Sequence, residues 1–157
     1  MPRPANTYAS GAKGPTSSAC RAGMPKIDLI LEARVQKAVR DAIAQGILRS
    51  AHDCSDGGLA VAVAESAIAG GIGADIPVEV PARWDAGLFG EQQSRIVVTV
   101  ASEDFQRLEQ IAASADVPLM RLGTVGGSHI NFGGICDVSL DLATNAWQFG
   151  FERATGG

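Results

Sequence analysis

Residues 50–60 hold the densest group of side chains that could do chemistry. They read Ser-Ala-His-Asp-Cys-Ser-Asp-Gly-Gly-Leu-Ala and lead directly into an apolar helical pattern. A helix start leaves backbone N–H groups unpaired and presents the positive end of the helix dipole, and glycines let a phosphate or another backbone approach closely. Carboxylates at this place also suit Mg²⁺. The candidate ligand- or phosphate-binding residues of this group are His52, Asp53, Ser55, Asp56, Gly57 and Gly58.

The same residues also fit a purely structural interpretation. Ser55 or Asp56 can cap the helix through a side-chain oxygen, while His52 and Asp53 satisfy backbone groups in the turn. On the residue types alone we favour capping, and ligand binding stays open as the alternative.

A second polar group lies at residues 90–95, just before the strongest strand pattern of the chain. The residues Glu91, Gln92, Gln93, Ser94 and Arg95 could orient a polar ligand through paired hydrogen bonds. The alternative is a solvated loop that joins Phe89 to the strand. The sequence alone leaves both interpretations standing.

The sequence gives less support to a catalytic nucleophile or to a metal site. Cys54 lies near His52, but the pattern supplies no third group to orient such a pair, and His129 is expected to have a surface or packing role. The three cysteines form no Cys-x-x-Cys pair, which argues against a disulfide framework or a zinc site and favours a reducing cytoplasm. We therefore predict no catalytic residue and no metal ligand in this chain.

The first elements that must position these groups follow from hydrophobic periodicity. Apolar residues recur at helical spacing over 31–43, and Gly46 ends that helix. A short strand over 47–51 leads into the motif, and a helix over about 57–69 follows it. Glu65 is the only charge in this second helix, so we expect it to be buried on most sides.

The remaining pattern predicts strands over 75–80 and 95–100, with a loop or short helix over 81–88 between them. Ser102 is expected to cap a helix, and 119–125 with 129–132 to form a hairpin around Gly126-Gly127. Ser139 is expected to cap a last short helix through Trp147. The sum is an α+β fold, with one mixed sheet and helices packed against it.

Length, composition and charge limit the number of domains and the classes of partner. The 157 residues are 46% hydrophobic, enough for one domain, which we place at 25–157. Residues 1–24 are rich in Pro, Ala, Ser and Gly and are predicted to be a disordered leader. The net charge of -4 and the scattered basic residues give no reason to expect a nucleic-acid partner, and no apolar run approaches the roughly 20 residues that span a bilayer.

Taken in order, the motifs resemble a known family. His52-Asp53-Cys54-Ser55-Asp56-Gly57-Gly58-Leu59 is followed by Leu88-Phe89-Gly90-Glu91-x-x-Ser94-Arg95, and then by Leu122-Gly123-x-Val125-Gly126-Gly127. This order is similar to the carboxyl-terminal end of the synthetase subunits of the phosphoribosylformylglycinamidine synthase family, within the aminoimidazole ribonucleotide synthetase superfamily. The resemblance covers roughly residues 27–147.

The resemblance implies a fold of the aminoimidazole ribonucleotide synthetase C-terminal type and a parent ligase of purine biosynthesis. That enzyme uses ATP and Mg²⁺ to convert formylglycinamide ribonucleotide and glutamine-derived ammonia into the amidine. The implied partners are the remaining synthetase domains, a glutaminase subunit and a small accessory subunit. Glu91-Gln92-Gln93 corresponds to a Glu-Ser-Gln run that contacts substrate in the earlier copy of this domain.

We therefore expect a domain or fragment that serves packing and interfaces, binds no cofactor alone and is inactive in isolation. Two other hypotheses remain. One is a stand-alone module that binds a phosphate or nucleotide at the Gly57-Gly58 helix start. The other is a non-enzymatic assembly protein that pairs through exposed apolar surface.

Overall fold

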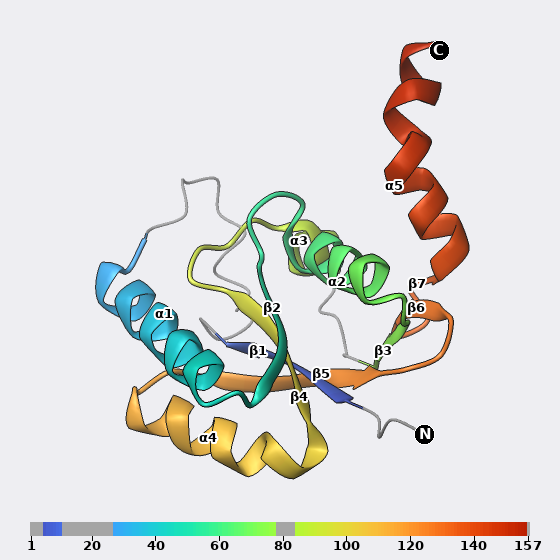
Figure 1. Cartoon of the computed structure of the whole chain (residues 1–157). Helices are drawn as coiled ribbons and strands as arrows, with labels where there is room; N and C mark the ends of the chain where they lie inside the picture. Colours follow the sequence, from blue (N-terminus) through green and yellow to red (C-terminus); the bar gives the residue numbers. More distant parts are fainter. Residues whose placement is uncertain (1–4, 11–26, 78–83, 157) are drawn as a thin grey trace.

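A seven-stranded sheet forms the centre of the molecule. The computed structural model describes residues 5–10, 27–77 and 84–156 (Figure 1). The strands are β1 Ala5–Ser10, β2 Leu48–Asp53, β3 Ala74–Ile76, β4 Ile96–Ala101, β5 Leu119–Val125, β6 His129–Phe132 and β7 Cys136–Ser139. Their order in the sheet is β2-β4-β1-β5-β3-β6-β7. Only β3 and β6 pair in parallel among these strands, so the sheet is mixed, and the predicted α+β class is confirmed.

Five α-helices surround this sheet in the described part of the chain. They are α1 Leu29–Ala44, α2 Gly58–Gly70, α3 Trp84–Phe89, α4 Phe105–Ser114 and α5 Leu140–Thr155. The side chains of β4 point alternately to two layers. Val98 and Val100 pack with α1 and α4, whereas Val97 packs with α2 and the adjoining α3. Figure 1 shows α2 and α3 on one side of the sheet and α4 on the other.

Side-chain oxygens cap the starts of α1 and α5, and the second of these caps was predicted. Asp28 Oδ1 accepts hydrogen bonds from the backbone N–H groups of Ile30 and Leu31, which caps α1. Ser139 Oγ accepts from the Leu142 N–H at 3.2 Å, which confirms the predicted cap. However, α5 continues to Thr155, two turns beyond the predicted end at Trp147.

The prediction of a disordered leader is wrong for Ala5–Ser10. These residues form β1, which pairs antiparallel with β4 on one edge and β5 on the other. The sequence interpretation depended on the absence of large apolar side chains, whereas main-chain hydrogen bonds to two later strands hold β1 in place. The other residues of the 1–24 segment lie outside the described part of the chain.

The predicted β5–β6 hairpin is also wrong. Strand β3 lies between β5 and β6, paired antiparallel with the first and parallel with the second. Gly73 and the glycine pair hold this arrangement: the Gly73 N–H donates to the Gly127 carbonyl at 2.9 Å, and the Gly126 N–H donates to the Gly73 carbonyl at 2.8 Å. The hairpin in this region joins β6 to β7, a strand that the sequence interpretation missed.

Two smaller expectations need correction. Ser102 opens a 3₁₀ turn, Ser102–Asp104, and the N-cap residue of α4 is Asp104, with no side-chain capping bond. The second predicted strand, 75–80, is represented by β3, and residues 78–80 lie outside the described residues.

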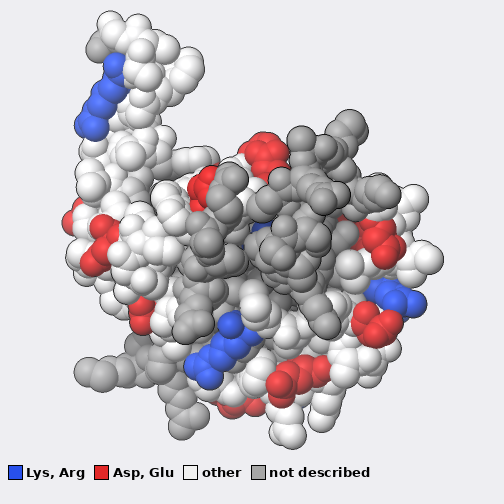
Figure 2. Space-filling model, turned by 180° about the vertical axis from the view of Figure 1, so that it is seen from behind, with Lys and Arg blue, Asp and Glu red and all other residues white. Residues whose placement is uncertain are grey.

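Charged side chains of one sign do not gather on the face of the molecule shown in Figure 2. On the face shown in Figure 2, the described Lys and Arg side chains lie apart from one another, with acidic side chains between them. Among the described residues, no helix is long and apolar enough to cross a membrane.

Candidate functional site

The polar motif after α1 begins on β2 rather than in a turn. The register of β2 on β4 shifts between Leu48 and Ser50, a bulge that turns Ser50 and His52 toward the α2 side of the sheet. Ser50 Oγ lies 2.7 Å from Thr99 Oγ1, and His52 Nε2 lies 2.9 Å from Glu65 Oε2 on α2. The bulge therefore sets which side chains of the motif meet the helix.

His52 is held from both ring nitrogens. Its Nδ1 lies 2.7 Å from the Asp53 carbonyl oxygen, and its Nε2 faces the Glu65 carboxylate. Both partners are acceptors, so a ring that carries a proton on each nitrogen donates to both. One feature of the sequence pointed to Glu65, since a lone charge on an otherwise apolar helix requires a partner. The sequence pattern did not identify His52 as this partner.

The predicted cap of α2 is wrong. Gly57 occupies the N-cap position with a left-handed φ of 77°, and no side chain caps the helix, so neither Ser55 nor Asp56 does. Both of these side chains are exposed. Instead, the Glu91 carboxylate accepts a hydrogen bond from the Gly57 N–H at 3.2 Å. A carboxylate at a helix start also interacts favourably with the helix dipole.

Gly58 explains why the motif needs two glycines. It has a φ of 69°, and a Cβ atom built on it would lie 2.8 Å from the Phe89 carbonyl carbon and 2.9 Å from the Gly90 carbonyl oxygen. The start of α2 thus rests directly on the backbone at the end of α3. The close approach that the sequence predicted is an approach to this chain's own backbone.

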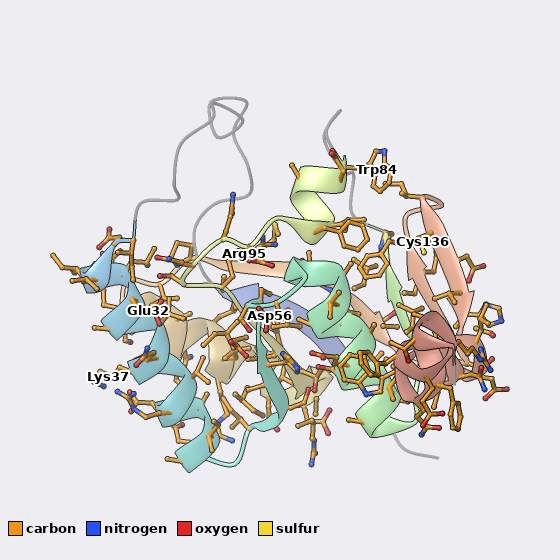
Figure 3. All side chains as sticks on the ribbon, turned by 90° about the horizontal axis from the view of Figure 1, so that it is seen from above. Glu32, Lys37, Asp56, Trp84, Arg95 and Cys136 are labelled. Carbon is orange, nitrogen blue, oxygen red and sulfur yellow. The ribbon has the colours of Figure 1, made fainter. Side chains whose placement is uncertain are left out.

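The second polar group completes the same junction. Ser94, at a φ of 61°, donates from Oγ to Glu32 Oε2 at 2.6 Å, and the Arg95 carbonyl accepts from the Cys54 N–H at 3.0 Å. Figure 3 shows Glu32 on α1, Asp56 ahead of α2 and Arg95 ahead of β4 around this region. The two predicted groups therefore meet, and together they join α1, α2, α3 and β4.

Three candidate residues, Gln92, Gln93 and Arg95, make no side-chain hydrogen bond with another described residue at this junction. The Gln92 N–H donates to the Gly90 carbonyl at 3.1 Å, which closes the turn, and Gln93 is exposed. Arg95 Nη1 is buried and has no hydrogen-bond partner, the one such side-chain atom among the described residues. No group of three or more His, Cys, Asp or Glu in the described ranges is placed to hold a metal ion.

Loss of the Glu91 carboxylate should weaken the junction. We expect Glu91→Gln to lower the free energy of unfolding by about 1 kcal/mol, because it removes a carboxylate that accepts from the Gly57 N–H and faces the positive end of the α2 dipole. Urea denaturation followed by circular dichroism measures the change. Gln93→Ala, two residues away on an exposed side chain, is the control and should change stability by less than about 0.5 kcal/mol. Equal effects of the two substitutions would contradict the role given to Glu91.

Burial raises the pKa of the Cys54 thiol; the charge of Arg95 lowers it and that of Asp53 raises it by smaller amounts. The unfolded chain ionises this thiol near pH 8.5, whereas the folded protein keeps it protonated to higher pH. Its contribution to stability is therefore complete below the unfolded pKa and is lost as the pH rises through the folded pKa.

We accordingly expect iodoacetamide at pH 8 to alkylate the exposed Cys136 and to spare Cys54 until the protein unfolds. Peptide mass mapping with and without urea checks this expectation. Rapid alkylation of Cys54 in the folded protein would show a reactive thiol instead. The other histidine, His129, contacts Asp137 Oδ1 at 2.8 Å across β6 and β7, in agreement with a surface role.

A cleft that the sequence did not predict opens elsewhere on the α2 side of the sheet. Its volume is about 840 Å³, and its walls come from α2, β2, β4 and the glycines at 126–127. None of the eleven candidate residues lines it. The junction and the cleft are therefore separate features.

Comparison with known proteins decides the family. The family described as "AIR synthase related protein, C-terminal domain" matches residues 5–134. The chain belongs to this family. The match begins with β1, earlier than the resemblance at 27–147 suggested, and it ends before β7 and α5.

Relatives of this family member are synthetase subunits. "Phosphoribosylformylglycinamidine synthase subunit PurL" from Anaeromyxobacter sp. (strain Fw109-5) is 43% identical over 136 residues, which cover 80% of this chain. The chain spans only 18% of the length of that relative.

Solved structures share the fold. "Structure of PurLQS from Thermotoga maritima" aligns with a TM-score of 0.73 at 18% identity, over 92% of this chain and 27% of that chain. "T. maritima PurL complexed with ATP" aligns with a TM-score of 0.70 at 19% identity, over 92% of this chain and 26% of that one.

Proposed function

We propose that this chain acts as the carboxyl-terminal domain of a phosphoribosylformylglycinamidine synthase. In this proposal it packs against the other synthetase domains, and those domains carry out the ATP-dependent amidination of formylglycinamide ribonucleotide with glutamine-derived ammonia. The observation that carries the proposal is the junction itself. The two polar motifs contact each other. The Gly57 N–H donates a hydrogen bond to the Glu91 carboxylate, and Gly58 packs closely against the backbone of residues 88–90.

The start of α2 is a poor place for a triphosphate, and no group of three or more His, Cys, Asp or Glu among the described residues is placed to hold Mg²⁺. Gly57 already gives its N–H to Glu91, and Gly58 has backbone where a phosphate would have to lie. Three of the exposed side chains around this helix start are the carboxylates of Asp53, Asp56 and Glu91, which repel a triphosphate. We therefore assign ATP and Mg²⁺ to other domains of the parent enzyme.

The relative from T. maritima is described as part of a PurLQS assembly. By analogy, we propose the remaining synthetase domains, a glutaminase subunit and a small accessory subunit as partners, in a reducing cytoplasm that suits the free Cys54 and Cys136.

The mass of the native gene product tests this proposal. Peptides from residues 27–147 should be found in a protein several times heavier than 16.2 kDa when source-cell extract is separated by denaturing electrophoresis. A native product of 16.2 kDa would contradict the assignment to one synthetase chain.

A stand-alone phosphate-binding module makes a different prediction. A ligand that binds the folded state at 100 times its dissociation constant adds about 2.7 kcal/mol of stability. We expect ADP and inorganic phosphate to leave the melting temperature unchanged. A saturable rise that is absent in Asp56→Ala would favour the binding module over the domain proposed above.

A further inference from the structure

Strand β1 joins the two parts of the central sheet. On one side of it lie β4 and β2, and on the other side lie β5, β3, β6 and β7 (Figure 1). All six residues of β1 pair antiparallel with β4, from Ala5 opposite Ala101 to Ser10 opposite Ile96. The same six residues also pair antiparallel with β5. The backbone of β1 is therefore paired along both edges.

The sequence of β1 has little preference of its own for an extended conformation. Thr7 and Tyr8 belong to residue types that are enriched in strands, whereas Asn6 and the two alanines belong to types that are depleted there. Main-chain hydrogen bonds need no particular side chain, because every residue except proline offers both an N–H and a C=O group. The strands on either side therefore decide that these residues form a strand.

These neighbouring strands have supports of their own. β4 pairs on its far edge with β2, and β5 pairs on its far edge with β3. On the α2 face of the sheet, Val97 of β4 and Leu122 of β5 belong to one buried cluster. On the other face, Leu119 of β5 packs against the cluster that contains Val98 and Val100 of β4. Core side chains thus hold β4 and β5 from both faces at two strand spacings, roughly 10 Å apart.

We propose that the gap between β4 and β5 is a binding site for an extended peptide, and that residues 5–10 are its covalently attached ligand. The site recognises main chain: a peptide binds when it lies antiparallel to both strands and offers them its N–H and C=O groups. Proline in the paired segment prevents binding, because it lacks the N–H group and is tolerated only at the edge of a sheet. This proposal does not depend on the proposed function.

Addition of the missing strand as a free peptide tests the proposal on the whole chain. Thr7→Pro removes an N–H group from the middle of β1 and should leave the site open. A peptide of residues 1–12 should bind this variant saturably and raise its melting temperature, whereas the same peptide carrying Thr7→Pro should do neither. Thr7→Ala is the matched control: it changes the side chain, keeps the N–H group and should behave like the unchanged chain.

The unchanged chain should bind the free peptide only weakly, because its own β1 already occupies the site. An attached strand competes at an effective concentration of about 1 mM, so a peptide with a Kd of about 10 μM for the open site should bind the unchanged chain about a hundredfold more weakly. Fluorescence anisotropy of a labelled peptide measures both dissociation constants.

Amide hydrogen exchange locates the bound peptide. In its complex with the Thr7→Pro chain, peptide residues 5–10 should be protected from exchange, as β4 and β5 are in the unchanged chain. The proposal would be overturned by a Thr7→Pro chain that is as stable as the unchanged one or that fails to bind the peptide. Equal binding of the peptide that carries Thr7→Pro, or equal binding to the unchanged chain, would overturn it as well.

Discussion

Gly58→Val is expected to lower the free energy of unfolding by about 3 kcal/mol or more, because two separate costs combine at this position. The first is backbone strain, since a β-branched residue is forced to a φ of 69°. The second is a clash with the backbone of Leu88, Phe89 and Gly90 at 2.8–2.9 Å. Backbone atoms cannot turn aside as a flexible side chain can, so α2 has to lift from the end of α3.

Gly71→Ala separates these two costs. Gly71 has a φ of 62° at the other end of α2, and a Cβ there meets nothing within 4 Å. This control should cost only about 1 kcal/mol of strain. Urea denaturation of both variants measures the difference. A Gly58→Val variant no less stable than Gly71→Ala would show that the junction between α2 and α3 is not close-packed.

Gly123→Ala is expected to have a second large effect, again about 3 kcal/mol of lost stability. A Cβ at this buried position would collide with the Asp75 carbonyl oxygen and lie 2.9 Å from the Ile76 Cα. The backbones of β3 and β5 pair directly beside this contact, through Asp75 with Thr124 and Ala74 with Val125. Alanine would therefore push β3 out of its place between β5 and β6.

The matched control is Gly126→Ala. Gly126 adopts no left-handed conformation, and a Cβ on it meets nothing within 4 Å, so the substitution should be close to neutral. Thermal denaturation measures the stability of the two variants, and amide hydrogen exchange measures the protection of β3 in each. If Gly123→Ala keeps normal protection at Asp75 and Ile76, the placement of β3 against β5 is contradicted.

Much of the fold could be predicted because it rests on local patterns. The helical spacing of apolar residues marks α1, and the β-branched run marks β4 with its two alternating faces. Asp28 and Ser139 cap helices through their own side chains, within three residues. Each of these features is decided by neighbours in the sequence.

The wrong predictions, for β1 and for the β5–β6 hairpin, concern strands whose pairing depends on residues far away in the sequence. β1 is held between β4 and β5, more than 80 residues later in the chain. The two strands on either side of Gly126-Gly127 do not pair, because β3 has inserted between them. Local turn chemistry favours a hairpin there, but it contains no information about a third strand.

At the candidate site, too, the local features were predicted and the contacts with distant residues were not. The sequence correctly indicated that Gly57 and Gly58 permit a close approach, but it assigned the cap to the adjacent Ser55 or Asp56. The carboxylate is supplied by Glu91, 34 residues away. The contact between His52 and Glu65 is likewise set by the bulge in β2, which no residue pattern of that strand predicts. Ligand binding by these residues stays a prediction.

The central claim is that this domain serves a larger synthetase and has no activity alone. The most direct test is ammonia-dependent amidine formation by a chimera. In this chimera, residues 5–157 replace the matching domain of the Anaeromyxobacter PurL subunit. We predict turnover within about tenfold of that subunit, a loss of at most about 1.4 kcal/mol in transition-state stabilisation, and none from the isolated chain. Turnover by the isolated chain, or a folded chimera without turnover, would contradict the claim.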